Sequence, residues 1–104
     1  MEEISISDII VSTAGRDQGK LFYVIGTEGV YVLIANGKDR KLEHPKRKKL
    51  KHVRFVTRTD TRVAVKLRTG EKVLNSEMRR DLADVRRSLA ENQEEGKEFW
   101  EKPM

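Results

Sequence analysis

The chain has 104 residues and a formal net charge of +5, with 38% charged and 37% hydrophobic residues. It contains no cysteine, which excludes disulfide bonds and thiolate metal sites. No apolar run approaches the roughly 20 residues of a membrane-spanning helix, and the acidic start Met1-Glu2-Glu3 lacks the basic and apolar regions of a signal peptide. We therefore expect one small cytoplasmic domain that is monomeric when free.

Three apolar runs near the N-terminus predict three β-strands. They are Asp8–Ala14, Leu21–Ile25 and Val30–Ala35, and each is rich in β-branched or aromatic residues. The second and third runs are apolar on both faces, whereas a sheet with one solvated face alternates with polar residues. We expect one face to enclose a core and the other to be covered by another part of the chain.

The segment between the first two runs, residues 15–20, predicts a tight turn. Gly15 and Gly19 are its structural residues, because tight reversals need a positive φ that glycine adopts without a Cβ penalty. Gly19 in particular is predicted to need a conformation that other residues resist.

Positive charge is concentrated in residues 38–54. This segment holds nine Lys or Arg residues and two acidic residues, so its net charge of +7 exceeds the +5 of the whole chain. A localised basic region is typical of proteins that bind a polyanion. A lysine-rich loop that is merely solvated is the alternative interpretation.

Within and after this basic segment, the pattern predicts a short edge strand, a loop and a further strand. The edge strand is Arg40–Glu43, whose charges discourage pairing with another chain. Lys46–Lys49 is the basic loop, and Leu50–Thr57 returns to strand with Val53 and Phe55 pointing inward.

The segment Arg58–Gly70 fits either a strand or a short helix. Alternating apolar residues favour a strand, but Thr59 or Asp60 at one end and Gly70 at the other are typical helix caps, and we favour the helix. In the helix, the inward residues are Val63, Ala64 and Leu67.

The clearest helix is Asn75–Asn92. Asn75 or Ser76 can cap it, and Glu77 lies in the first turn, where the helix dipole favours an acid. An apolar stripe at helical spacing is predicted to pack on the sheet and consists of Met78, Leu82, Val85 and Leu89.

The polar side of this helix and the tail are assigned no binding role. The helical arginines Arg79, Arg80, Arg86 and Arg87 are assigned to ion pairs along the helix. Residues 93–104 predict a loose tail, with Phe99-Trp100 as the exception. Trp100 either docks on the barrel or helix or contacts a partner, and we favour docking.

The turn and its flanking strands resemble a KOW motif, a short β unit of ribosomal proteins and of the transcription factor NusG. The match runs through a strand, Gly15-Arg16-Asp17-Gln18-Gly19-Lys20, an apolar strand and a hairpin, with Gly19 at the family's glycine position. Further along, Val30–Ile34, Asn36-Gly37-Lys38 and the Pro-basic run His44–His52 resemble KOW-bearing large-subunit ribosomal proteins of archaea and eukaryotes. The resemblance covers roughly residues 5 to 56.

For residues 1–57 this resemblance implies a small SH3-like (KOW) barrel of about five strands. Together with the pattern of the later residues, it gives a mainly β protein with a C-terminal helix, in which residues 58–92 are a helical segment packed on the barrel and residues 93–104 are the tail. It also implies an RNA-binding protein associated with the ribosome, whose partners are ribosomal RNA and ribosomal particles.

The residues themselves supply phosphate-binding chemistry and no catalytic set. The only histidines, His44 and His52, lie in or beside a basic loop that repels cations, and the turn at Gly19-Lys20 lacks the Ser or Thr of a P-loop. We expect no enzyme activity, cofactor, metal, membrane or small-molecule substrate.

The predicted RNA contacts are residues that can neutralise or hydrogen-bond phosphates. An aromatic content of 6% argues against a base-stacking platform and favours recognition of folded RNA through its phosphates, chiefly by the basic loop. The candidates are Arg16, Gln18, Lys20, Lys38, Arg40, Lys41, Lys46, Arg47, Lys48, Lys49, Lys51 and His52.

Two other functions fit the same sequence. The first is an SH3-like protein–protein interaction module of the transcription or translation machinery, which a groove of exposed aromatic residues would favour. The second is an architectural protein that binds DNA without sequence preference. Competition between structured RNA and duplex DNA at fixed salt distinguishes the latter.

Overall fold

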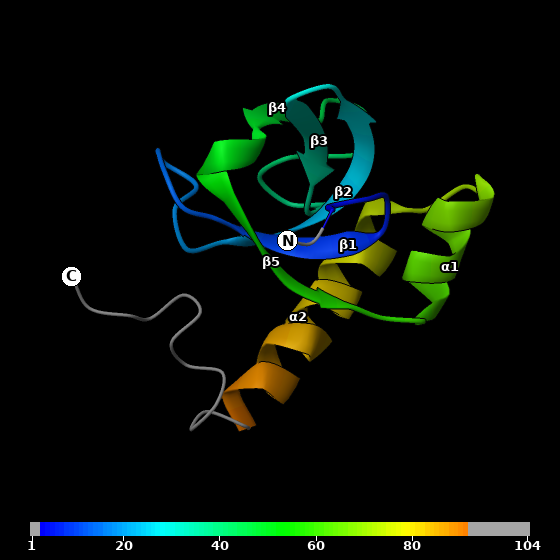
Figure 1. Cartoon of the computed structure of the whole chain (residues 1–104). Helices are drawn as coiled ribbons and strands as arrows, with labels where there is room; N and C mark the ends of the chain where they lie inside the picture. Colours follow the sequence, from blue (N-terminus) through cyan, green and yellow to red (C-terminus); the bar gives the residue numbers. More distant parts are fainter. Residues whose placement is uncertain (1–2, 92–104) are drawn as a thin grey trace.

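A computed structural model describes residues 3–91, so the predicted tail with Phe99 and Trp100 lies outside the described part of the chain. The chain forms a five-stranded antiparallel sheet followed by two α-helices (Figure 1). The elements are β1 (Asp8–Ser12), β2 (Leu21–Glu28), β3 (Tyr31–Ala35), β4 (Lys46–Lys49), the 3-10 turn η1 (Leu50–His52), β5 (Val53–Arg58), α1 (Arg62–Thr69) and α2 (Asn75–Glu91).

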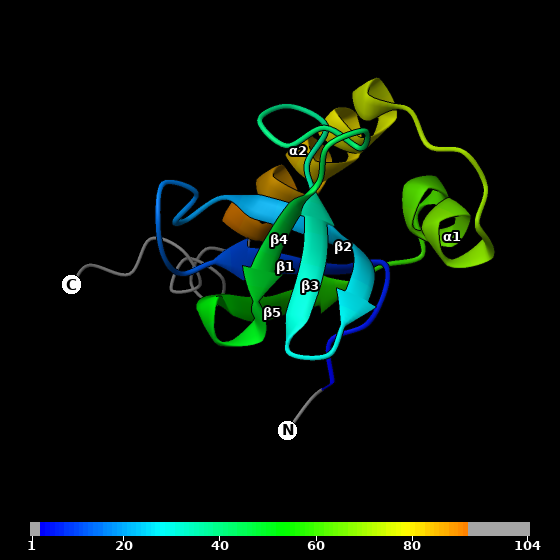
Figure 2. The ribbon, with the colours of Figure 1, turned by 90° about the horizontal axis from the view of Figure 1, so that it is seen from above.

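The strands are ordered β4-β3-β2-β1-β5, and every pair of neighbours is antiparallel. Among the described residues, β4 and β5 are the two edges, so the sheet is not closed into the expected barrel. The chain leaves β4 after four residues, coils through η1 and pairs β5 with β1 at the far edge. The sheet is strongly curved, and β3 and β4 run in a different direction from β1 and β5 (Figure 2).

The sheet carries a core on each face, which confirms the interpretation of two-sided apolar strands. On one face Ile10, Phe22, Val24, Val32 and Ile34 are fully buried and pack together. On the other face the helices cover the sheet. That second core joins Ile9, Val11, Leu21, Tyr23, Ala35 and Val56 of the sheet to Val63, Ala64, Met78 and Leu82 of the helices.

A bulge in β5 adds Val56 to the inward residues predicted for this strand, of which Val53 packs against the first core. The register with β1 shifts between Ile9 and Ile10, which inserts Val56 as an extra residue. A bulge interrupts the two-residue alternation of a strand. As a result Val56 is buried at 8% exposure, whereas Val53 and Phe55 are only half-buried.

Helix α1 confirms the helical alternative for its segment, with one correction at its start. The capping residue is Thr61, whose hydroxyl accepts a hydrogen bond from Ala64 N, and not Thr59 or Asp60. Gly70 ends the helix in the left-handed conformation, as expected. Val63 and Ala64 are buried against the sheet.

Helix α2 packs its predicted stripe on the sheet. Met78 and Leu82 are buried, while Val85 and Leu89 are partly buried against the same core. Neither Asn75 nor Ser76 is the cap: Leu74 O accepts the first helical bond and Leu74 N donates to Glu77, which lowers the pKa of that carboxyl.

Two predictions for the connection between β3 and β5 are wrong. Arg40–Glu43 forms no strand, because the side chain of Asn36 accepts hydrogen bonds from Lys38 N and Arg40 N and closes a turn there. Lys46–Lys49 is not a loop but strand β4, which pairs residue by residue with β3.

Candidate nucleic-acid interface

Two turns at the same end of the sheet hold four of the predicted basic residues: Arg16 and Lys20 in the first, and Lys38 and Arg40 in the second. The first turn, residues 13–20, is closed by hydrogen bonds from Gly19 N to Ser12 O at 2.8 Å and from Ser12 N to Lys20 O at 3.1 Å. Gly19 has a φ of +88°, which confirms the conformation predicted for it. The second turn, residues 36–40, is closed by the Asn36 side chain.

An ion pair joins the two turns. Asp17 in the first turn is buried, and its carboxylate contacts Arg40 Nη2 of the second turn at 3.2 Å. The ion pair therefore holds Arg40 between the two turns. The Nε–H group of Arg40 is itself buried and has no acceptor among the described residues.

The sheet-side cavity lies beside this ion pair and measures about 330 Å³. Four cationic side chains from three separate segments line it, against the single carboxylate of Asp17. They are Arg16 of the first turn, Arg40 of the second turn, and Lys46 and Lys48 of β4. The excess of positive charge makes the cavity suited to an anion such as phosphate.

Lys48 differs from the other cations of the sheet-side cavity because it is buried, at 8% exposure. Its Nζ donates a hydrogen bond to the carbonyl of Ala14 at 2.8 Å. The Lys48 side chain therefore stabilises the first turn. In the solvated loop that was predicted, this side chain would have been exposed.

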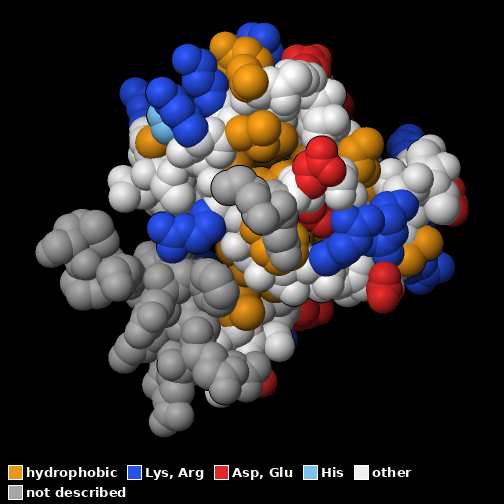
Figure 3. Space-filling view, in the orientation of Figure 1, with side chains coloured by type: hydrophobic (Ala, Val, Ile, Leu, Met, Phe, Trp, Pro, Cys, Tyr) orange, Lys and Arg blue, Asp and Glu red, His pale blue; other side chains and the backbone are white. Residues whose placement is uncertain are grey.

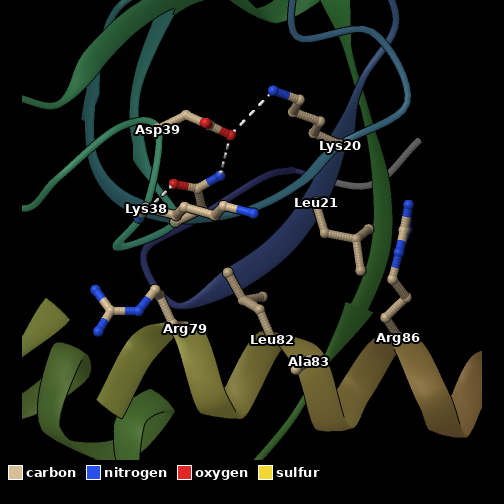
Figure 4. A pocket seen from close by; sticks show the side chains of 9 residues that line it. Lys20, Leu21, Lys38, Asp39, Arg79, Leu82, Ala83 and Arg86 are labelled. Carbon is tan, nitrogen blue, oxygen red and sulfur yellow. Dashed lines mark hydrogen bonds and ion pairs between the residues drawn. The ribbon is translucent and has the colours of Figure 1, made fainter. Parts of the chain in front are cut away.

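The helix-side cavity lies between the second turn and α2 and measures about 340 Å³ (Figure 4). Lys20 and Lys38 line it from the turns, and Arg79 and Arg86 line it from α2. Its only carboxylate is Asp39, which accepts from Lys20 Nζ at 3.0 Å, and this bond lowers the pKa of Asp39.

Sequence reasoning did not count Arg79 and Arg86 among the candidate binding residues, and for Arg79 the predicted pairing along the helix is wrong. Arg79 instead donates to the carbonyl of Gly37 at 2.8 Å, across to the second turn. The available signal was their position next to the apolar stripe, because residues that flank a buried stripe lie nearest the surface it packs against.

The remaining predicted residues line neither cavity. Arg47 lies over the ring of Tyr31, at 3.7 Å from the ring centroid, and pairs with Glu28 at 3.2 Å. Gln18, Lys41, Lys49 and Lys51 are exposed, and His52 is half-buried. Figure 3 shows Lys and Arg side chains gathered at the end of the molecule where β4 and η1 lie.

Two further searches concern metals and membranes. Within residues 3–91, no group of three or more His, Asp or Glu side chains is arranged to hold a metal ion. No helix in that range is long and apolar enough to cross a membrane.

Comparison of the sequence with protein families and with curated proteins identifies no relative. No protein-family model matches the sequence. No curated protein matches it at a significant level. The function is therefore argued from the site and from the KOW resemblance.

Proposed function

We propose that this protein binds RNA through phosphate contacts made by the two turns and β4. The observation that carries the proposal is the sheet-side cavity, which Arg16, Arg40, Lys46 and Lys48 line from three segments together with one carboxylate, that of Asp17. Such an excess of positive charge is unfavourable unless an anion offsets it, and arginine offers phosphate paired hydrogen bonds.

The KOW resemblance supports RNA as the polyanion. The turn that resembles the motif, residues 15–20, contributes Gly15, Arg16 and Asp17 to the cavity. Five antiparallel strands, strongly curved around an apolar core, are consistent with an SH3-like (KOW) class for the sheet. The proposed association with ribosomal particles depends on the resemblance alone.

The arrangement favours recognition of the backbone over recognition of bases. Tyr23 is fully buried, and Arg47 covers one face of the Tyr31 ring. Neither tyrosine ring can therefore be stacked between two bases. The cations, by contrast, are presented from rigid turns and a strand. We therefore propose that the protein reads the shape and phosphates of folded RNA.

Binding to a fluorescein-labelled RNA hairpin, measured across a salt series, tests the proposal. With about four to six phosphates neutralised, log K is expected to fall with log salt at a slope of roughly −3 to −4. Arg16→Gln with Lys46→Gln should lower both affinity and slope. The matched control is Arg62→Gln with Lys72→Gln, which removes two exposed cations that line neither cavity.

Equal binding by the two double variants would contradict the proposed surface. Tighter binding to duplex DNA than to the hairpin at the same salt would favour the architectural DNA-binding alternative. Absence of RNA binding by the wild-type protein would leave the protein–protein module as the better explanation. Co-sedimentation with ribosomal particles, followed by crosslinking to ribosomal RNA, tests the ribosomal association separately.

A further inference from the structure

We infer that the helix-side cavity holds a second phosphate group of the same RNA, so that helix α2 forms part of the RNA-binding surface. The inference rests on the proposed function and extends it to residues outside the KOW-like segment. The cavity is lined by Lys20 and Lys38 on one side and by Arg79 and Arg86 on the other.

The charged residues that line the helix-side cavity are mostly cationic, as expected for a site that holds an anion. Figure 4 shows Arg86 rising from α2 beside Leu82, the guanidinium of Arg79 extending away from Leu82, and Lys20 and Lys38 across the cavity from the helix. Among the described residues that line the cavity, four are cationic and one, Asp39, is acidic. Like charges gathered in this way repel one another, and an anion between them relieves the repulsion.

The floor of the cavity is rigid, which a binding site for a small charged group requires. Leu82 is buried at 6% exposure, and Gly37 and Asn36 beside it are buried as well. Arg79 is held to the turn through its bond to Gly37 O, and Lys20 through Asp39. Arg79 and Lys20 are therefore held in place, and they lose little side-chain freedom when a phosphate binds.

The same two turns contribute residues to both cavities, which makes one continuous strand of RNA a suitable occupant. Lys20 of the helix-side cavity and Arg16 of the sheet-side cavity belong to the same turn, and Lys20 N donates to Asp17 O at 3.0 Å. Asp39 and Arg40 are adjacent in the second turn and face different cavities. A phosphodiester backbone that crosses the turns would meet both cavities in succession.

The test compares two pairs of arginines at the same spacing on α2, in the full-length protein. Arg79→Gln with Arg86→Gln removes the cavity pair. Arg80→Gln with Arg87→Gln removes an exposed pair that does not line the cavity and changes the net charge equally. Affinity for the labelled RNA hairpin and its salt slope are measured for both, with thermal melting as the control for folding.

The cavity variant is expected to bind the hairpin about tenfold more weakly or worse. Its salt slope should be smaller by about 1 to 2, and the matched variant should retain most of the affinity. Because Arg79 also holds Gly37 O, a second variant, Lys38→Gln with Arg86→Gln, removes two cavity charges and leaves that bond in place. The same loss is expected from it.

Equal affinities for the cavity and matched variants would overturn the inference, provided that Arg16→Gln with Lys46→Gln still weakens binding. If Arg16→Gln with Lys46→Gln also leaves the affinity for the hairpin unchanged, the proposed function itself is overturned. A third outcome concerns the ligand class: if poly-glutamate displaces the hairpin from wild type as effectively as unlabelled RNA at equal charge, the cavity is a site for acidic peptides.

Discussion

The hydroxyl of Tyr23 donates a hydrogen bond to the carboxylate of Asp81 and thereby joins strand β2 to helix α2. Thr61, the capping residue of α1, donates to the same carboxylate at 3.0 Å. The tyrosine ring is fully buried in the core between the sheet and the helices. The Asp81 carboxylate therefore holds both helices to the sheet. By holding α2, it also positions the α2 side of the helix-side cavity.

Replacing Tyr23 by phenylalanine should destabilise the fold. The variant keeps the buried ring but leaves Asp81 with one donor fewer, and a hydrogen bond to a charged group contributes about 1.5–3 kcal/mol. Urea denaturation measures the loss. Tyr31→Phe, the same chemical change at a half-buried site, is the control. Equal stability of the two variants would mean that the bond to Asp81 contributes nothing.

The same contact predicts a loss of stability at alkaline pH. Burial, followed by the hydrogen bond to Asp81, raises the pKa of Tyr23 from 10.0 to about 12. A pKa raised by folding stabilises the protein below the unfolded value, and that stabilisation disappears as the pH rises from about 10 to 12. Wild type should lose about 2–3 kcal/mol relative to Tyr23→Phe over this range. A constant difference between the two proteins would refute the assignment.

Leu82→Ala should destabilise the protein by about 2–5 kcal/mol, because the side chain is buried between α2 and the sheet. Leu74→Ala is the matched control: Leu74 is 52% exposed just before α2, and its loss should cost less than about 0.5 kcal/mol. Chemical denaturation of both variants gives the comparison. A loss under 1 kcal/mol for Leu82→Ala would mean that α2 is not part of the core.

The sequence predicted the elements whose signals are local. Three strands, the turn at Gly19 and both helices follow from apolar periodicity and from glycine positions, and all are present. The start of α1 was misplaced by one or two residues, because Thr59, Asp60 and Thr61 are all good capping residues. Only the tertiary bond from Thr61 to Asp81 distinguishes them.

What the sequence missed depends on contacts between distant residues. The run Lys46–Lys49 has no apolar alternation, so its pairing with β3 and the burial of Lys48 carry no local signal. The extra residue in β5 likewise depends on its register with β1. Arg79 and Arg86 join Lys20 and Lys38 only because α2 packs beside the second turn, so the helix-side cavity was not predictable from spacing alone.

Gly37 is expected to tolerate substitution less well than Gly19. Both have positive φ, of +78° and +88°, so alanine at either site incurs about 1–2 kcal/mol of backbone strain. A Cβ at Gly19 would meet no atom within 4 Å, whereas a Cβ at Gly37 would collide with the backbone carbonyl of Asn75 at the start of α2. Gly37→Ala should therefore lower the melting temperature more than Gly19→Ala. The reverse order would show that α2 does not pack closely on the second turn.

Lys48 and Lys49 are neighbours in β4 with the same charge, and they should nevertheless respond differently to replacement. Lys48 is buried and donates to Ala14 O, whereas Lys49 is exposed. Lys48→Met removes one of the two donors to the Ala14 carbonyl, which still accepts from Ser12 Oγ, and the loss of a hydrogen bond from a charged group costs about 1.5–3 kcal/mol. Lys49→Met should change the free energy of unfolding by less than about 0.5 kcal/mol.

The Lys48 comparison also revises what a quadruple Lys46–Lys49 variant can show. A solvated loop would lose its charges without any change in melting, but β4 includes one buried lysine that supports the turn of the sheet-side cavity. We expect the quadruple glutamine variant to melt at a lower temperature, and the variant that retains Lys48 to melt like wild type. Thermal melting followed by circular dichroism distinguishes them. Identical melting of all three proteins would mean that Lys48 is solvated in solution, and that the loss of RNA binding in the quadruple variant reports charge alone.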